Sequence, residues 1–120
     1  MNEITKTTAN WTALDTMNSE ISMSLKDCDG MEIPVLSIAL GKEYIERFNG
    51  DQTIVTLKDT DGNYYSTISA TAVRTLEKAI PLVDEGMALN ARISIRQTKG
   101  GQDFIAVTMS ERINKEAGEF

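Results

Sequence analysis

The order of strand-like and helix-like segments constrains the fold of this chain more than any other feature of its sequence. Strands are predicted where apolar or β-branched residues alternate with polar ones or fill a strand-length run, in residues 33–40, 52–58, 63–69, 89–96 and 104–109. Between the third and fourth strands, residues 73–80 carry apolar side chains at helical spacing, and Pro81 is expected to stop this helix. The predicted order is therefore strand, strand, strand, helix, strand, strand.

Turns between these segments favour a barrel. Glycine-containing turns at residues 59–62 and 99–102 join the second strand to the third, and the fourth to the fifth, as hairpins. A helix between the third and fourth of five strands is the order of the OB fold, a small Greek-key barrel. The sequence therefore predicts an all-β chain with one short helix, folded as a five-stranded OB-type Greek-key β-barrel. An open antiparallel sheet with the helix packed on one face would use the same elements.

Segments at both ends lie outside this pattern. The first 18 residues contain Trp11 but no sustained periodicity, and we expect an extended or mobile arm. Alternation in residues 21–25 predicts one additional short strand, and the last ten residues are acidic with little folding signal. The predicted organisation is an N-terminal arm (1–18), an OB domain (19–110) and an acidic C-terminal tail (111–120).

The residue types exclude several classes of protein. Histidine is absent and Cys28 is the only cysteine, which excludes an internal disulfide, most metal sites and histidine-activated nucleophiles. Asp27 and Asp29 flank Cys28 and would raise the pKa of its thiol. No glycine-rich phosphate loop is present, and the loop at residues 59–63 has too few acids for a calcium site. We expect no enzyme activity, no cofactor and no metal.

No apolar run approaches the roughly 20 residues that cross a bilayer. Residues 1–10 also lack the basic and apolar regions of a signal peptide. We therefore expect a cytoplasmic protein without membrane contact.

Positive charge is concentrated in one part of this acidic chain. The formal net charge is −6, yet residues 86–102 contain three basic side chains and no acid. OB barrels bind single strands with a basic groove for phosphates and aromatic rings for bases. The candidate nucleic-acid-binding residues are Lys58, Tyr64, Tyr65, Arg92, Arg96, Lys99 and Phe104.

Each candidate also has a purely structural explanation. Tyr64 and Tyr65 point to opposite faces of a strand, so one of the two rings belongs to the core. Phe104 can also be a core residue, and the arginines of the fourth strand can form a solvated face. Lys58 can pair with an acid of the neighbouring turn. Three roles are possible for Trp11: a stacking platform for a base, an anchor in a dimer, or a contact with the barrel.

The first hairpin carries a resemblance to a known family. Residues 53–69, TIVTLKDTDGNYYSTIS, followed by Val73 and Arg74 on the helix and then by a basic strand, are similar to small single-stranded DNA-binding proteins of bacteriophages and mobile elements. The resemblance covers residues 33–110 and lies in the strand order and the hairpin. It implies an OB fold, binding of single strands with little sequence preference, and frequent homo-oligomers.

The function expected on this basis is binding of single-stranded DNA during phage or mobile-element DNA replication or recombination. The alternative is a protein-interaction or assembly module on the same barrel, which would not bind nucleic acid. A homodimer or larger assembly is expected because strand 21–25 has no partner in a five-stranded barrel and would leave an exposed edge.

The end of the chain resembles the acidic, Phe-terminated tails of bacterial single-stranded DNA-binding proteins, which recruit replication and repair partners. Glu119 and Phe120 are the candidate partner-binding residues. The chain departs from that family at Gly118 and Glu119, which stand where an apolar residue and proline are usual. We expect contacts with replication or recombination proteins through this tail.

Overall fold

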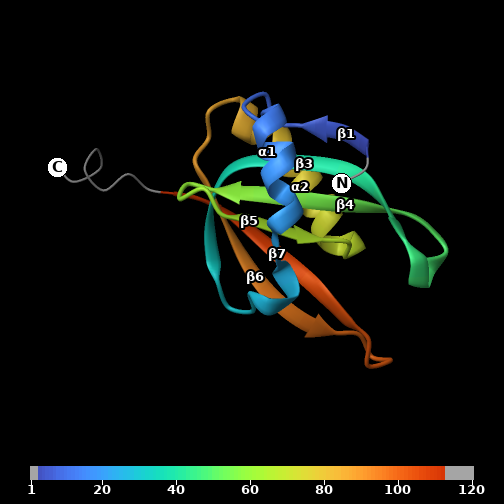
Figure 1. Cartoon of the computed structure of the whole chain (residues 1–120). Coiled ribbons are helices and arrows are strands. Elements are labelled where there is room, and N and C mark those ends of the chain that lie inside the picture. Colours follow the sequence, from blue (N-terminus) through green and yellow to red (C-terminus); the bar gives the residue numbers. More distant parts are fainter. Residues whose placement is uncertain (1–2, 113–120) are drawn as a thin grey trace.

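A computed structural model describes residues 3–112 of the chain. Within this range, seven strands form one sheet, with two α-helices and three short 3-10 helices (Figure 1). The strands are β1 (Glu3–Thr7), β2 (Met23–Ser24), β3 (Glu32–Ile45), β4 (Gly50–Asp59), β5 (Tyr64–Thr67), β6 (Leu89–Gln97) and β7 (Asp103–Glu111). The helices are α1 (Ala13–Asn18) and α2 (Ala70–Asp84), with 3-10 turns η1 (Ser19–Ile21), η2 (Leu25–Asp27) and η3 (Glu46–Phe48).

The predicted OB-type fold is confirmed. The order β3, β4, β5, α2, β6, β7 is the expected one, and β3 pairs antiparallel with both β4 and β6. β3 bends between its two partners, because a register irregularity between Val35 and Ser37 interrupts its ladder with β4. The order of strands in the sheet is β2-β5-β4-β3-β6-β7. The sheet curls into a half-barrel, and its ends at β2 and β7 are not joined.

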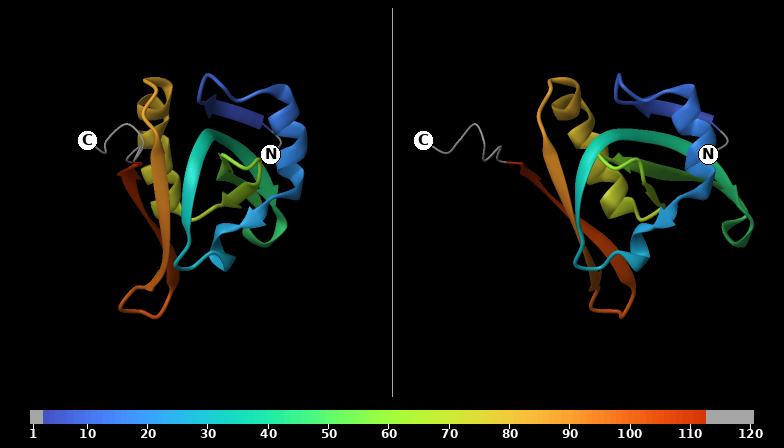
Figure 2. Two further views of the ribbon diagram at one scale, coloured as in Figure 1. Left: turned by 90° about the vertical axis from the view of Figure 1, so that its left-hand side faces the viewer. Right: turned by 60° about the vertical axis from the view of Figure 1, so that its left-hand side comes forward.

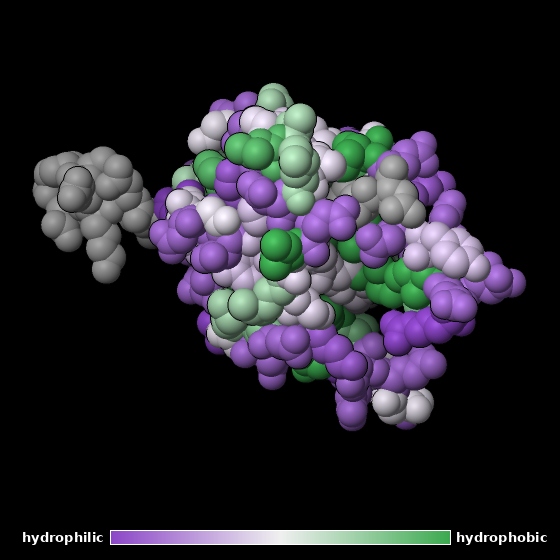
Figure 3. All heavy atoms as spheres, viewed as in Figure 1, coloured by the Kyte–Doolittle hydropathy of each residue, from purple (hydrophilic) through white to green (hydrophobic). Residues whose placement is uncertain are grey.

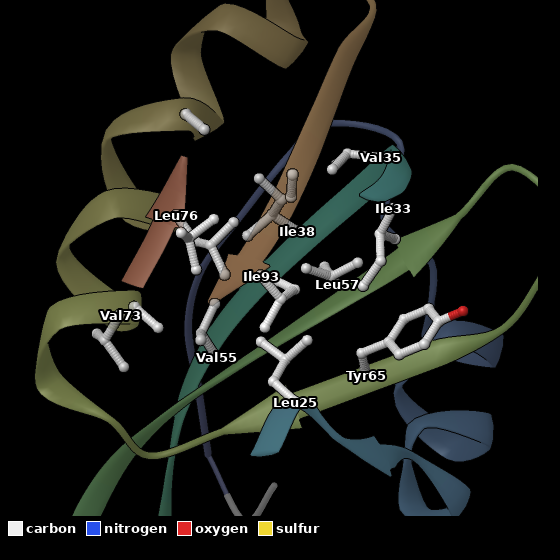
Figure 4. Close-up of a cluster of buried hydrophobic side chains, with 14 of the residues drawn as sticks. Leu25, Ile33, Val35, Ile38, Val55, Leu57, Tyr65, Val73, Leu76 and Ile93 are labelled. Carbon is white, nitrogen blue, oxygen red and sulfur yellow. The ribbon is translucent and has the colours of Figure 1, made fainter. Parts of the chain in front are cut away.

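The core lies inside this curl, and α2 covers one side of it. Leu76 of α2 points toward Ile38 of β3, beside Leu57 and Ile93 from the neighbouring strands (Figure 4). All four side chains are fully buried. Each contributes about 1.5–3 kcal/mol of apolar burial, so packing supplies the stability of a chain without disulfides.

The sequence predicted that helix α2 would stop at Pro81. In the structure the helix continues to Asp84. Proline removes one backbone donor, but it lies at an exposed position in the last turn, where water can satisfy the lost partner. Beyond the proline, Leu82 and Val83 pack against the core, and the Glu85 amide donates to the Pro81 carbonyl at 3.0 Å. Packing therefore extends the helix past its sequence signal.

The N-terminal segment differs from the expected arm. β1 pairs with the outer part of β3, and the buried Thr8 exchanges hydrogen bonds with the backbone of Ile38. α1 follows and lies across β4 and β5, on the side of the sheet opposite α2 (Figure 2). Strand β1 is held by pairing rather than by burial, so its sequence shows no alternation.

The additional strand predicted at residues 21–25 is shorter and has a partner. Only Met23 and Ser24 form β2, which pairs in parallel with β5 of the same chain. Leu25 and Cys28 after it are fully buried. The predicted strand therefore has a partner within its own chain, and its other edge lies at the β2 end of the sheet.

Candidate nucleic-acid interface

Two hairpins extend beyond the core (Figure 2), and a hollow of about 590 Å³ lies between them (Figure 3). The β3–β4 hairpin turns through η3 and Asn49, whose φ of 49° is left-handed, and the β6–β7 hairpin turns at residues 98–102. The hollow lies where the curled sheet is open between its β2–β5 end and β7, and the Ile105 amide crosses this opening and donates to Ser69 Oγ at 3.2 Å. Its lining residues are Ser22, Ser24, Lys26, Ile45, Arg47, Ile54, Ser66, Thr67, Ile68, Ser69, Ala70, Thr71, Ile95, Asp103, Phe104 and Ile105.

The lining of the hollow combines charged, hydroxyl-bearing and aromatic side chains with several aliphatic ones. Lys26 and Arg47 are exposed cations at its margin, while Asp103 is the acid among the lining residues. Serine and threonine hydroxyls from β2, β5 and the start of α2 supply hydrogen-bond donors that suit phosphate oxygens. Phe104 is half-buried and adds an aromatic surface for a base.

Further rings lie at the tip of the β3–β4 hairpin. The Arg47 guanidinium carbon lies 4.8 Å from the centre of the Phe48 ring, and half of Phe48 is exposed. Tyr44 is similarly exposed, and its hydroxyl donates to Asn49 Oδ1 at 3.3 Å. The tip therefore presents a cation and two rings beside the hollow.

Three of the basic residues predicted to bind nucleic acid, Arg92, Arg96 and Lys99, lie on the β6–β7 hairpin. Arg96 is directly opposite Phe104 in the ladder, and Arg92 is opposite Thr108 on the same face. Lys99 lies in the turn, and all three basic side chains are exposed. Arg96, Lys99 and Phe104 thus gather at one end of the hairpin, whereas Arg92 lies toward β3, where its backbone partner is Glu32.

Lys58 and Tyr64 lie elsewhere, on the outer face of β4 and β5 beneath α1. The Asp15 carboxylate accepts a hydrogen bond from Lys58 Nζ at 2.8 Å and another from the Tyr64 hydroxyl at 2.6 Å. Burial alone would raise the pKa of Asp15, but hydrogen bonds from Lys58, Tyr64 and Thr12 outweigh it and lower the pKa to about 2. Trp11 packs edge-on against Tyr64, with ring centres 6.1 Å apart.

Tyr65 belongs to the core. It is 5% exposed, and its hydroxyl donates to Asp59 Oδ2 at 2.8 Å. Burial, with a further contribution from Asp59, raises the pKa of Tyr65 to about 12. Asp59 also accepts hydrogen bonds from the backbone amides of Asp61 and Asn63. Its carboxylate therefore holds the β4–β5 turn in place.

Comparison with known proteins identifies the family. The family model for phage single-stranded DNA-binding proteins matches residues 6–111. The chain belongs to this Phi29-type family of phage single-stranded DNA-binding proteins. No curated protein and no solved structure matches it significantly. Family membership supports binding of single-stranded DNA, and the family is defined by DNA binding rather than by a catalytic activity.

Two cations that line the hollow, Lys26 and Arg47, were not among the candidates predicted from the sequence. Lys26 and Arg47 come from short 3-10 turns rather than from a strand with a basic face. Arg47 stands next to Phe48 between two strands, and this pairing of a cation with a ring was the available signal. Lys26 had no such signal, because only tertiary folding brings η2 to the hollow.

The remaining predictions concern Cys28, metal binding, membrane contact and the tail. Burial and the neighbouring Asp27 raise the pKa of the Cys28 thiol, which disfavours the thiolate. In residues 3–112, no group of three potential ligands is placed to hold a metal ion. No helix in that range is long and apolar enough to cross a membrane. Glu119 and Phe120 lie outside the described residues.

Proposed function

We propose that this phage-type protein binds single-stranded DNA with little sequence preference in the hollow between its two hairpins. It would do so during phage or mobile-element replication or recombination in the cytoplasm of the host cell. The observation that carries this proposal is the lining of the hollow, which brings together Lys26, Arg47, serine and threonine hydroxyls and Phe104. The centre of binding is then not Lys58 but the opening between the β2–β5 end of the sheet and β7.

The hollow suits a single strand. Cations and hydroxyls bind phosphates without reading sequence, and rings stack on every type of base. Arg96, opposite Phe104 in the β6–β7 ladder, and Lys99 in the turn add exposed positive charge on that hairpin, and Arg47 adds it on the other. A duplex presents no unstacked bases to Phe104, so a single strand of equal length should compete far better.

A fluorescence titration with an unstructured labelled oligonucleotide at several salt concentrations tests the proposal. Affinity should fall as salt rises, with a slope of about 0.7 for each phosphate that the protein neutralises. Equal competition by single strands and duplex would contradict the proposal and point to a non-specific basic patch. Absence of binding at low salt would favour the alternative of a protein-interaction module.

The assembly state and the tail partners remain predictions. Leu14, Met17 and Ile21 are largely exposed and supply an apolar surface for a second copy of the chain. Sedimentation that shows only monomer at micromolar concentration would contradict the homo-oligomer. Loss of Glu119 and Phe120 should weaken capture of replication or recombination proteins without weakening DNA binding.

A further inference from the structure

The outer face of β4 and β5 is covered by the protein's own N-terminal segment. Thr56 and Lys58 of β4 lie opposite Ser66 and Tyr64 of β5, and these four side chains form what we term the covered face. OB barrels bind nucleic acid on the corresponding strands. In this chain, residues 11–22 lie over that surface (Figure 1).

Helix α1 packs on this face with its polar side. Leu14 and Met17 are 63% and 70% exposed, whereas the carboxylate-bearing Asp15 is 3% exposed. Asp15 is the buried residue of this six-residue helix. Isolated helices this short are marginal in water, so α1 depends on its contacts with the covered face. Little apolar burial by the helix itself opposes its release.

The groups that hold Asp15 would also hold a nucleotide. The carboxylate receives the Lys58 ammonium and the Tyr64 hydroxyl, a pair of donors that binds a phosphate oxygen equally well. Lys58 Nζ also lies 5.7 Å from the centre of the Tyr64 ring. Trp11 forms a T-shaped contact with this ring, which becomes more available to a base when Trp11 moves away.

The covered face is continuous with the hollow. Ser66 Oγ donates to Ser22 Oγ at 2.7 Å and also lies 2.7 Å from Thr56 Oγ1. Ser22 and Ser66 both line the hollow. Because Tyr64 and Ser66 share one face of β5, a strand that leaves the hollow along β5 reaches α1 directly.

We propose that residues 11–22 are a displaceable cover over a second DNA-binding surface, and that a strand longer than the hollow replaces α1 on Lys58 and Tyr64. This inference rests on the proposed function. A phosphate then takes the position of the Asp15 carboxylate, so Lys58 passes from one anion to another and is never left unpaired. The buried Thr8 and Leu25 on either side of the cover hold the rest of the segment to the barrel.

Trp11 is the only tryptophan of the chain and therefore reports on the cover without any substitution. Oligonucleotides of about 4 and about 16 nucleotides span the site sizes of OB folds. Binding is measured by the anisotropy of labelled DNA, and Trp11 by its emission and by its quenching with acrylamide. The longer strand should change the emission of Trp11, while the shorter one should bind and leave it unchanged.

A matched pair of variants tests the role of the carboxylate. Asp15→Asn removes the charge that competes with phosphate but preserves the side-chain shape, and it should tighten binding of the longer strand on the order of fivefold. Binding of the shorter strand should not change. Glu20→Gln removes an exposed acid from the same segment, and it should affect both lengths alike.

The outcomes separate this inference from the proposed function. If both lengths bind while Trp11 does not respond and Asp15→Asn shows no dependence on length, the cover is permanent and the inference is overturned, although the hollow still binds DNA. If neither length binds at low salt, the proposed function fails and the inference fails with it. If Asp15→Asn does not fold, the Trp11 response of the unmodified chain decides.

Discussion

The hollow and the covered face contain similar chemistry, but they differ in what occupies them. Each combines cations, hydroxyls and an aromatic ring, through Lys26, Arg47 and Phe104 in the hollow and through Lys58 and Tyr64 on the face. The hollow is open to solvent, whereas the cation of the face is paired at 2.8 Å with Asp15. The chain therefore pairs one basic and aromatic cluster with its own acid and leaves the other cluster open.

Two acids of this acidic protein are buried within the fold, away from the hollow. Of its acids, Asp15 is buried on the covered face and Asp59 is buried beside Tyr65. Both carboxylates stabilise local structure instead of repelling a strand at the hollow. The net charge of −6 therefore says little about the potential in the hollow, which depends on the side chains nearest to it.

The largest expected effect is a loss of DNA affinity when side chains that line the hollow are removed. Replacing Arg47 and Phe104 together with alanine should weaken single-strand binding on the order of 100-fold, because one stacked base is worth about 1–3 kcal/mol and a phosphate contact is lost as well. Lys78→Ala, which removes an exposed cation from α2, is the control. Anisotropy titrations measure both variants, and equal affinities would show that DNA binds elsewhere.

The next effect concerns the stability of the covered face. Asp15→Ala removes the acceptor of Lys58 and Tyr64 and the capping box with Thr12. We expect a loss of about 2 kcal/mol in the free energy of unfolding, and a melting temperature lower by roughly 5–10 °C. Calorimetry of this variant beside Glu20→Gln checks it. An unchanged melting temperature would mean that α1 contributes nothing to the folded state.

Acid should weaken the covered face over a defined range of pH. The pKa of Asp15 lies at about 2 in the folded chain and at 3.8 ordinarily, so its stabilisation is present above pH 4 and is lost as the pH falls through 2. The loss amounts to about 2 kcal/mol. Urea unfolding from pH 6 to 2 should show this loss in the unmodified chain and not in Asp15→Asn. Parallel curves for the two proteins would contradict it.

The smallest expected effect concerns the tail. Deleting residues 116–120 should leave the melting temperature unchanged and leave DNA binding equal or tighter at low salt, because an acidic tail competes with phosphate for the basic side chains. This attraction is screened over about 10 Å at 0.1 M salt. Comparing the affinities of full-length and truncated chains at two salt concentrations measures it. A clear loss of stability or affinity would show that Phe120 contacts the barrel.

The sequence by itself determined the order of strands and the class of fold. Alternation in the strands from residue 33 onward, the glycine turns and the helical spacing of residues 73–80 are local signals, and the core uses the apolar residues that create them. The basic and aromatic side chains of the β6–β7 hairpin were also predictable, because strand pairing places Arg96 opposite Phe104.

Only the tertiary structure decided where these side chains act. The partner of Lys58 lies 43 positions away in sequence, on a helix whose apolar residues face outward, so no local pattern indicated the contact. The hollow collects side chains from two hairpins, from β2 and from the start of α2, and it lies where the curled sheet is not closed between its β2–β5 end and β7. Periodicity records which face of a segment is buried, whereas the choice of which distant segment covers it depends on the packing of the whole chain.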